Sequence, residues 1–81
     1  MALIKTIERG SNGWNKIIYT DGTIFEGYTD EVGNRISFGT LYSQDGSILA
    51  KGEWSGDNLI ESMDELTFKK QINKLLRQTS I

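Results

Sequence analysis

The chain has 81 residues, a formal net charge of −2, and neither cysteine nor histidine. A chain of this length forms one domain, and the missing residue types exclude disulfides, cysteine or histidine zinc sites, cysteine nucleophiles and histidine-based triads. The acidic balance argues against nucleic acid as a partner, because nucleic-acid binding relies on clustered Lys and Arg. We therefore expect one small domain that is not an enzyme and needs no cofactor.

Residues 1–5 carry no apolar run of signal-peptide length, and no stretch approaches the ~20 apolar residues of a membrane span. The sequence therefore predicts a cytoplasmic protein, and it argues against a membrane as the partner.

Five β-prone segments follow one another in the first two thirds of the chain, and turn-forming residues separate them. The segments are residues 2–8, 14–19, 23–29, 35–42 and 47–54. Asp21-Gly22 and Asp45-Gly46 lie between β-prone segments and are typical of type I′ hairpin turns. Short turns between successive strands predict an antiparallel meander over residues 2–54.

A helix is predicted over residues 62–79, after a linker at residues 55–61. Ser62-Met63-Asp64-Glu65 has the form of a capping box at its start. An apolar face follows at helical spacing, formed by Phe68, Ile72, Leu75 and Leu76. The sequence thus predicts one α+β domain over residues 1–81: about five antiparallel strands, with a C-terminal amphipathic helix packed on one face.

The two Asp-Gly turns belong to an internal repeat. Gly39-Thr40-Leu41-Tyr42-Ser43-Gln44-Asp45-Gly46-Ser47, followed by Lys51-Gly52-Glu53-Trp54, resembles a MORN repeat, and residues 19–28 look like a degenerate copy. The resemblance covers residues 19–57. It implies a non-catalytic sheet of stacked hairpins that binds partners or membranes. Convergent hairpin chemistry, or another small β-fold such as an SH3-like barrel, would give a similar pattern.

Two sets of carboxylates are candidate chemical sites. Glu26 and Glu53 occupy equivalent repeat positions, where a carboxylate pair could serve acid–base chemistry, but solvent-facing strand residues explain them as well. Asp30, Glu31 and Asn34 offer oxygen ligands for calcium, but their spacing does not fit an EF-hand loop and indicates a polar turn. We therefore expect no catalytic residue and no metal site.

The aromatic residues are the better candidates for a contact surface, because Tyr and Trp are enriched in binding hot spots. Trp14 and Trp54 lie at strand ends beside glycine-containing turns, and Tyr28 lies next to the acidic Asp30 and Glu31. These five residues form the predicted partner-binding surface. The alternative is that both tryptophans pack against the helix or its linker.

The predicted helix carries a basic face formed by Lys69, Lys70, Lys74 and Arg77. This face is compatible with simple solvation, with docking of an acidic protein, or with contact to phosphate or lipid headgroups. The leading hypothesis is a small protein–protein interaction module, of the adaptor, inhibitor or immunity type found in bacteria and phages. The alternative is peripheral contact with an anionic membrane or nucleic acid through the basic face. An open meander also has two unpaired strand edges, which invite a homodimer.

Overall fold

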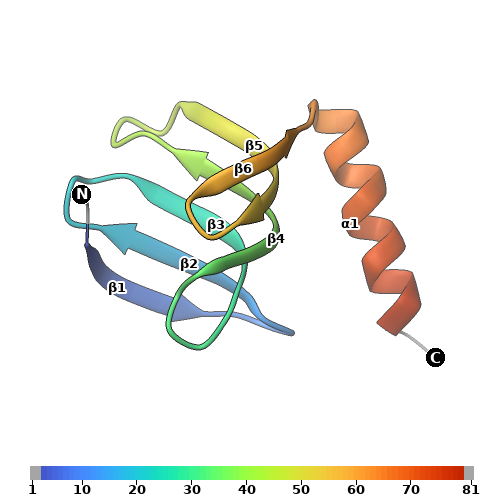
Figure 1. The fold of residues 1–81 in the computed structure, drawn as a ribbon, viewed down its shortest axis with the longest axis horizontal. Helices are drawn as coiled ribbons and strands as arrows, with labels where there is room; N and C mark the ends of the chain where they lie inside the picture. Colours follow the sequence, from blue (N-terminus) through green and yellow to red (C-terminus); the bar gives the residue numbers. More distant parts are fainter. Residues whose placement is uncertain (1–2, 80–81) are drawn as a thin grey trace.

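The computed structural model describes residues 3–79 and consists of one antiparallel sheet and one helix (Figure 1). The elements are β1 (Ile4–Arg9), β2 (Trp14–Tyr19), β3 (Ile24–Thr29), β4 (Arg35–Tyr42), β5 (Ile48–Ser55), β6 (Asn58–Ser62) and α1 (Glu65–Thr79). Each strand pairs with the next in the order β1-β2-β3-β4-β5-β6. The α+β class, the antiparallel meander and the C-terminal helix are confirmed.

The segment predicted as a linker contains a sixth strand instead. Gly56, with a φ of 59°, turns the chain back at the end of β5, and β6 then pairs with β5. The helix begins at Glu65, three residues later than predicted, because Asp64 and not Ser62 is its cap. The Asp64 carboxylate accepts a hydrogen bond from the Thr67 N–H at 2.8 Å, whereas Ser62 belongs to β6.

The sheet curls around its own core. The buried cluster contains Ile17, Tyr19, Phe25 and Trp54. The partly buried residues packed against it come from β1, β4, β5 and β6: Ile7, Leu41, Ala50 and Leu59. All six strands therefore contribute to one cluster on the inner face of the sheet, which curls enough to bring Trp54 of β5 to residues of β2 and β3.

Arg35 is half-buried on this inner face and contacts three aromatic rings. Its guanidinium carbon lies 5.1, 5.0 and 4.7 Å from the ring centroids of Tyr19, Phe25 and Trp54. Its Nε and Nη2 donate hydrogen bonds to the Tyr19 hydroxyl at 3.1 and 2.9 Å. A single cation is thus packed among the largest side chains of the core.

The two Asp-Gly turns share one conformation, which is not type I′. Type I′ needs positive φ at both central residues. Here Gly22 and Gly46 have φ values of 89° and 92°, while Asn12 is the one non-glycine residue with positive φ in the described part of the chain. The Gly22 N–H bonds the Tyr19 carbonyl and the Gly46 N–H bonds the Ser43 carbonyl, each at 3.0 Å. Both loops are therefore three-residue turns with glycine in the left-handed position.

The second turn is tightened around the Asp45 carboxylate. The hydroxyls of Ser43 and Ser47 and the Ser47 N–H donate hydrogen bonds to it. These bonds favour the ionised form and lower the pKa of Asp45 to about 2.

Replacing Asp45 by alanine is expected to lower stability at neutral pH, and the difference from wild type should narrow as the pH falls. A depressed pKa in the folded state means that the stabilisation is complete above the ordinary value of 3.8 and is lost as the pH drops toward about 2. Thermal unfolding of both proteins across this pH range measures the effect. Asp57→Ala is the control, because Asp57 is exposed. A loss in Asp45→Ala that does not change with pH would contradict the prediction.

Candidate functional site

The outer face of the sheet, opposite the core cluster, carries a row of polar residues. The strand register aligns Lys16 with Glu26, Glu26 with Thr40, and Thr40 with Lys51 across β2 to β5. Trp14 lies two residues before Lys16, and Tyr42 two residues after Thr40, so strand alternation puts both on this face as well. The helix α1 covers the end of the outer face near Trp14.

The start of α1 is held to the sheet by one buried aromatic residue and an ion pair. Phe68 is 8% exposed, and the Lys51 ammonium lies 5.2 Å from its ring centroid. Lys51 also forms an ion pair with Glu65, which Lys69 approaches to 3.7 Å. The hydrogen bond from Lys51 lowers the pKa of Glu65. Further along the predicted apolar face, Ile72 and Leu75 are half-buried and Leu76 is 46% exposed.

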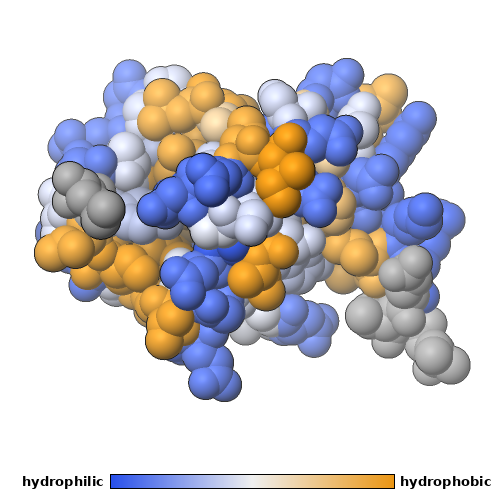
Figure 2. Space-filling view, viewed as in Figure 1, coloured by the Kyte–Doolittle hydropathy of each residue, from blue (hydrophilic) through white to orange (hydrophobic). Residues whose placement is uncertain are grey.

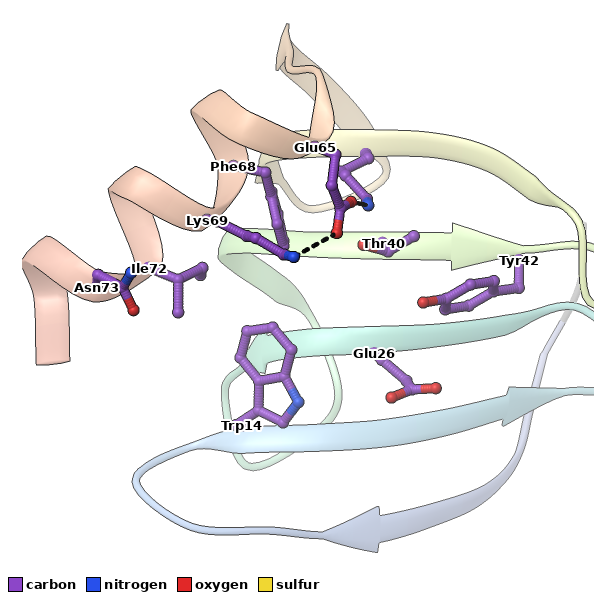
Figure 3. A pocket seen from close by; sticks show the side chains of 10 residues that line it. Trp14, Glu26, Thr40, Tyr42, Glu65, Phe68, Lys69, Ile72 and Asn73 are labelled. Carbon is purple, nitrogen blue, oxygen red and sulfur yellow. Dashed lines mark hydrogen bonds and ion pairs between the residues drawn. The ribbon is translucent and has the colours of Figure 1, made fainter.

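A groove with a volume of about 390 Å³ lies between α1 and the outer face (Figure 3). Its lining combines three aromatic rings with two carboxylates and two lysines. The lining residues are Trp14, Glu26, Thr40, Tyr42, Lys51, Glu65, Phe68, Lys69, Ile72 and Asn73. The helix supplies one wall and strands β2 to β5 supply the floor, so the groove exists because α1 covers only part of the sheet.

A second, smaller hollow of about 230 Å³ lies near the end of the same helix. Its lining includes Trp14, Tyr28, Ile72 and Leu76. Trp14 and Tyr28 meet edge to face there, with ring centroids 5.1 Å apart. Trp14 therefore belongs to both hollows and separates them.

The five predicted partner-binding residues do not form one surface. Trp14 and Tyr28 lie together, half-buried beside α1. Trp54 is 4% exposed, and its indole N–H donates to the Gly39 carbonyl at 3.0 Å inside the core. The expectation that Trp54 is available to a partner is therefore wrong for this fold.

Asp30 and Glu31 line neither hollow. The Asp30 carboxylate accepts hydrogen bonds from the side chain and N–H of Asn34 and from the Val32 N–H, which lower its pKa. The Glu31 carbonyl accepts a bond of 2.7 Å from Arg9. Asp30 thus closes the turn between β3 and β4.

The basic face of α1 is partly compensated by acids at the helix start. Lys69 lies 3.7 Å from Glu65, and Arg77 also makes an interaction. The pKa of Asp64 is lowered chiefly by the Thr67 N–H and additionally by the charge of Lys70. Lys70 and Lys74 are exposed. In Figure 2, hydrophilic side chains cover most of this helix.

Sequence reasoning missed the groove. The sequence pattern presents Glu26 as a member of a carboxylate pair and Tyr42 as part of the repeat, and neither pattern indicates a groove. The alternation of side chains along β3 and β4 places Glu26 and Tyr42 on the same face as Trp14. The groove also needs α1 as its second wall, and the direction of α1 is not visible in the sequence.

Within residues 3–79, no three acidic side chains gather in a way that suits a metal ion. Over the same residues, the helical structure lacks the length and the apolar character that a membrane span requires. Comparison with protein-family models, with curated proteins and with solved structures finds no match. The MORN resemblance remains a prediction that depends on the sequence motif.

Proposed function

We propose that this chain is a non-enzymatic protein–protein interaction module that holds its partner in the groove between α1 and the outer face of the sheet. The observation that carries the proposal is the groove itself, about 390 Å³ with aromatic rings at both ends. Half-buried Trp and Tyr side chains with polar neighbours are typical of binding hot spots. Trp14 and Tyr42 are the proposed anchors.

The MORN-like character belongs to the same proposal. Both Asp-Gly hairpins have the same turn conformation. In each, the aspartate carboxylate accepts a hydrogen bond from the N–H two residues later: from Thr23 to Asp21 at 2.9 Å and from Ser47 to Asp45 at 3.0 Å. This supports a relationship between the two hairpins. An adaptor, inhibitor or immunity role in a bacterial or phage cytoplasm is the class of function that we propose for such a module.

Two other modes of contact rank lower. Contact with an anionic membrane or nucleic acid through α1 is weakened because Glu65 and Asp64 offset part of its charge. Homodimer formation through a sheet edge is weakened because both edge strands carry an irregularity, at Ile4/Thr6 in β1 and opposite Glu53/Trp54 in β6. Bulges at edge strands protect against strand addition.

Tyr42→Ala is expected to abolish capture of the partner from the lysate of the native host. Removing a hot-spot aromatic costs about 2 kcal/mol or more of binding free energy, which is roughly a thirtyfold loss of affinity. The measurement is a tagged pull-down at low and moderate salt, with mass spectrometry of the retained proteins. Val32→Ala is the control, because Val32 is 70% exposed in the β3–β4 turn. Equal retention by both variants would contradict the groove as the binding site.

A further inference from the structure

We infer that the groove recognises a cationic side chain, arginine or lysine, of the partner, held on the Glu26 carboxylate between Trp14 and Tyr42. This inference depends on the proposed function and specifies the chemistry of the partner. It assigns a ligand-binding role to Glu26, beyond simple solvation of the sheet.

The first argument is the position of Glu26. It lies at the centre of the outer face, is half-buried, and lines the groove with Trp14 and Tyr42 (Figure 3). Its carboxylate makes no ion pair or hydrogen bond with any residue from 3 to 79. A partly desolvated carboxylate favours a cation, and aromatic rings beside it add cation–π attraction.

The second argument is that the chain already holds one of its own cations between a carboxylate and an aromatic ring. Lys51 lies against the Phe68 ring and forms an ion pair with Glu65. Arg35 shares only the aromatic part of this arrangement: it lies against three rings in the core, and the Tyr19 hydroxyl, not a carboxylate, accepts its hydrogen bonds. Glu26 with its two aromatic neighbours offers the same groups, but to a cation that must come from outside the chain.

The third argument is the distribution of charge in the groove. Lys51 and Lys69 share Glu65 at the helix end, which leaves that end with an excess of one positive charge. Glu26 is the one acidic residue at the opposite end of the lining. A cation is therefore directed to Glu26 and away from the helix.

One neighbouring group opposes the proposed contact. Lys16 is directly opposite Glu26 in the β2–β3 register, although it does not line the groove. Its charge should weaken binding of a second cation. Removing that charge should therefore strengthen binding, which a purely structural role of Glu26 would not predict.

The test is a titration of the ¹⁵N-labelled protein with N-acetyl-arginine amide, followed by amide chemical shifts. N-acetyl-citrulline amide, which is neutral and nearly the same shape, is the matched probe. We expect saturable shifts at residues 14, 26 and 42 with the arginine probe only. Glu26→Gln should weaken binding roughly five- to tenfold, as expected for a partly desolvated charged contact, and Lys16→Gln should tighten it roughly twofold.

Glu53→Gln is the matched control variant. Glu53 lies two residues after Lys51 in β5, so strand alternation puts it on the outer face as well, but it does not line the groove. It should bind the arginine probe like wild type. The spectra also report whether each variant remains folded.

Three results would overturn the inference: equal shifts with the citrulline probe, shifts centred elsewhere, or unchanged affinity in Glu26→Gln. A partner captured through Tyr42 with the same affinity in wild type and Glu26→Gln would reject the cation site and leave the interaction module standing. If both Tyr42→Ala and Glu26→Gln capture the partner as well as wild type does, the groove itself is rejected as the binding site.

Discussion

Gly39→Ala should remove much of the stability of this protein. Gly39 faces Gly27 across β3 and β4, and the Phe25 ring packs directly over it. A Cβ at position 39 would overlap Cζ of that ring and lie 2.7 and 2.9 Å from its Cε1 and Cε2 atoms. Phe25 is fully buried and cannot withdraw. Overpacking of this kind costs about 3 kcal/mol, against a total stability of roughly 4–12 kcal/mol for a chain of this size.

Urea unfolding followed by tryptophan fluorescence, to which Trp14 and buried Trp54 both contribute, measures the loss. Gly46→Ala is the matched control, because a Cβ there meets nothing within 4 Å. Its positive φ of 92° should cost about 1–2 kcal/mol, which is less than the overpacking at position 39. Adding Phe25→Leu to Gly39→Ala should recover part of the loss, since the smaller side chain leaves room for the new methyl group. A Gly39→Ala protein as stable as wild type would contradict this account of the core.

The glycines illustrate what could be predicted from the sequence. The Asp-Gly pairs and the alternation around them indicate hairpins, and these hairpins are present. The sequence identifies Gly27 and Gly39 only as parts of a repeat. Their physical role is to leave room for the end of the Phe25 ring above two adjacent strands. This role depends on cross-strand register, which is not visible in a single segment.

The two tryptophans illustrate what could not be predicted. Both lie at strand ends beside glycine turns, and alternation assigns each to a face without saying which face becomes the core. The sheet curls so that its inner face, which carries Trp54, encloses the core. The helix α1 then covers part of the outer face, which carries Trp14. Both faces carry aromatic residues, so hydrophobicity alone does not distinguish the buried tryptophan from the half-buried one.

The sixth strand was missed for a related reason. Residues 58–62 contain two apolar residues, Leu59 and Ile60, and two of the others are polar and uncharged, so the segment has no clear period of two. Its pairing is irregular as well, because Ile60 falls where the register shifts. Leu59 nevertheless packs against the core, which is what fixes the strand there. The position of α1, and with it the groove, depends on where β6 ends.

Arg35→Ala should be the most damaging substitution of a charged residue in this chain. The guanidinium touches three core rings and donates two hydrogen bonds to the Tyr19 hydroxyl. Alanine removes these contacts and leaves a gap among the aromatic residues. The expected loss is about 2–4 kcal/mol of unfolding free energy.

Arg35→Lys separates the charge of this side chain from its shape. Lysine keeps the positive charge, but it lacks the planar guanidinium that stacks on the rings and bonds Tyr19 through two nitrogens. It should therefore restore less than half of the stability that alanine loses.

Tyr19→Phe, which removes the shared acceptor, should cost about 1 kcal/mol in wild type and clearly less in the Arg35→Ala background. Urea unfolding of these variants, with Lys16→Ala on the outer face as the control, measures each difference. If Arg35→Lys is as stable as wild type, charge alone holds this position and the stacking of the guanidinium on the core rings adds nothing.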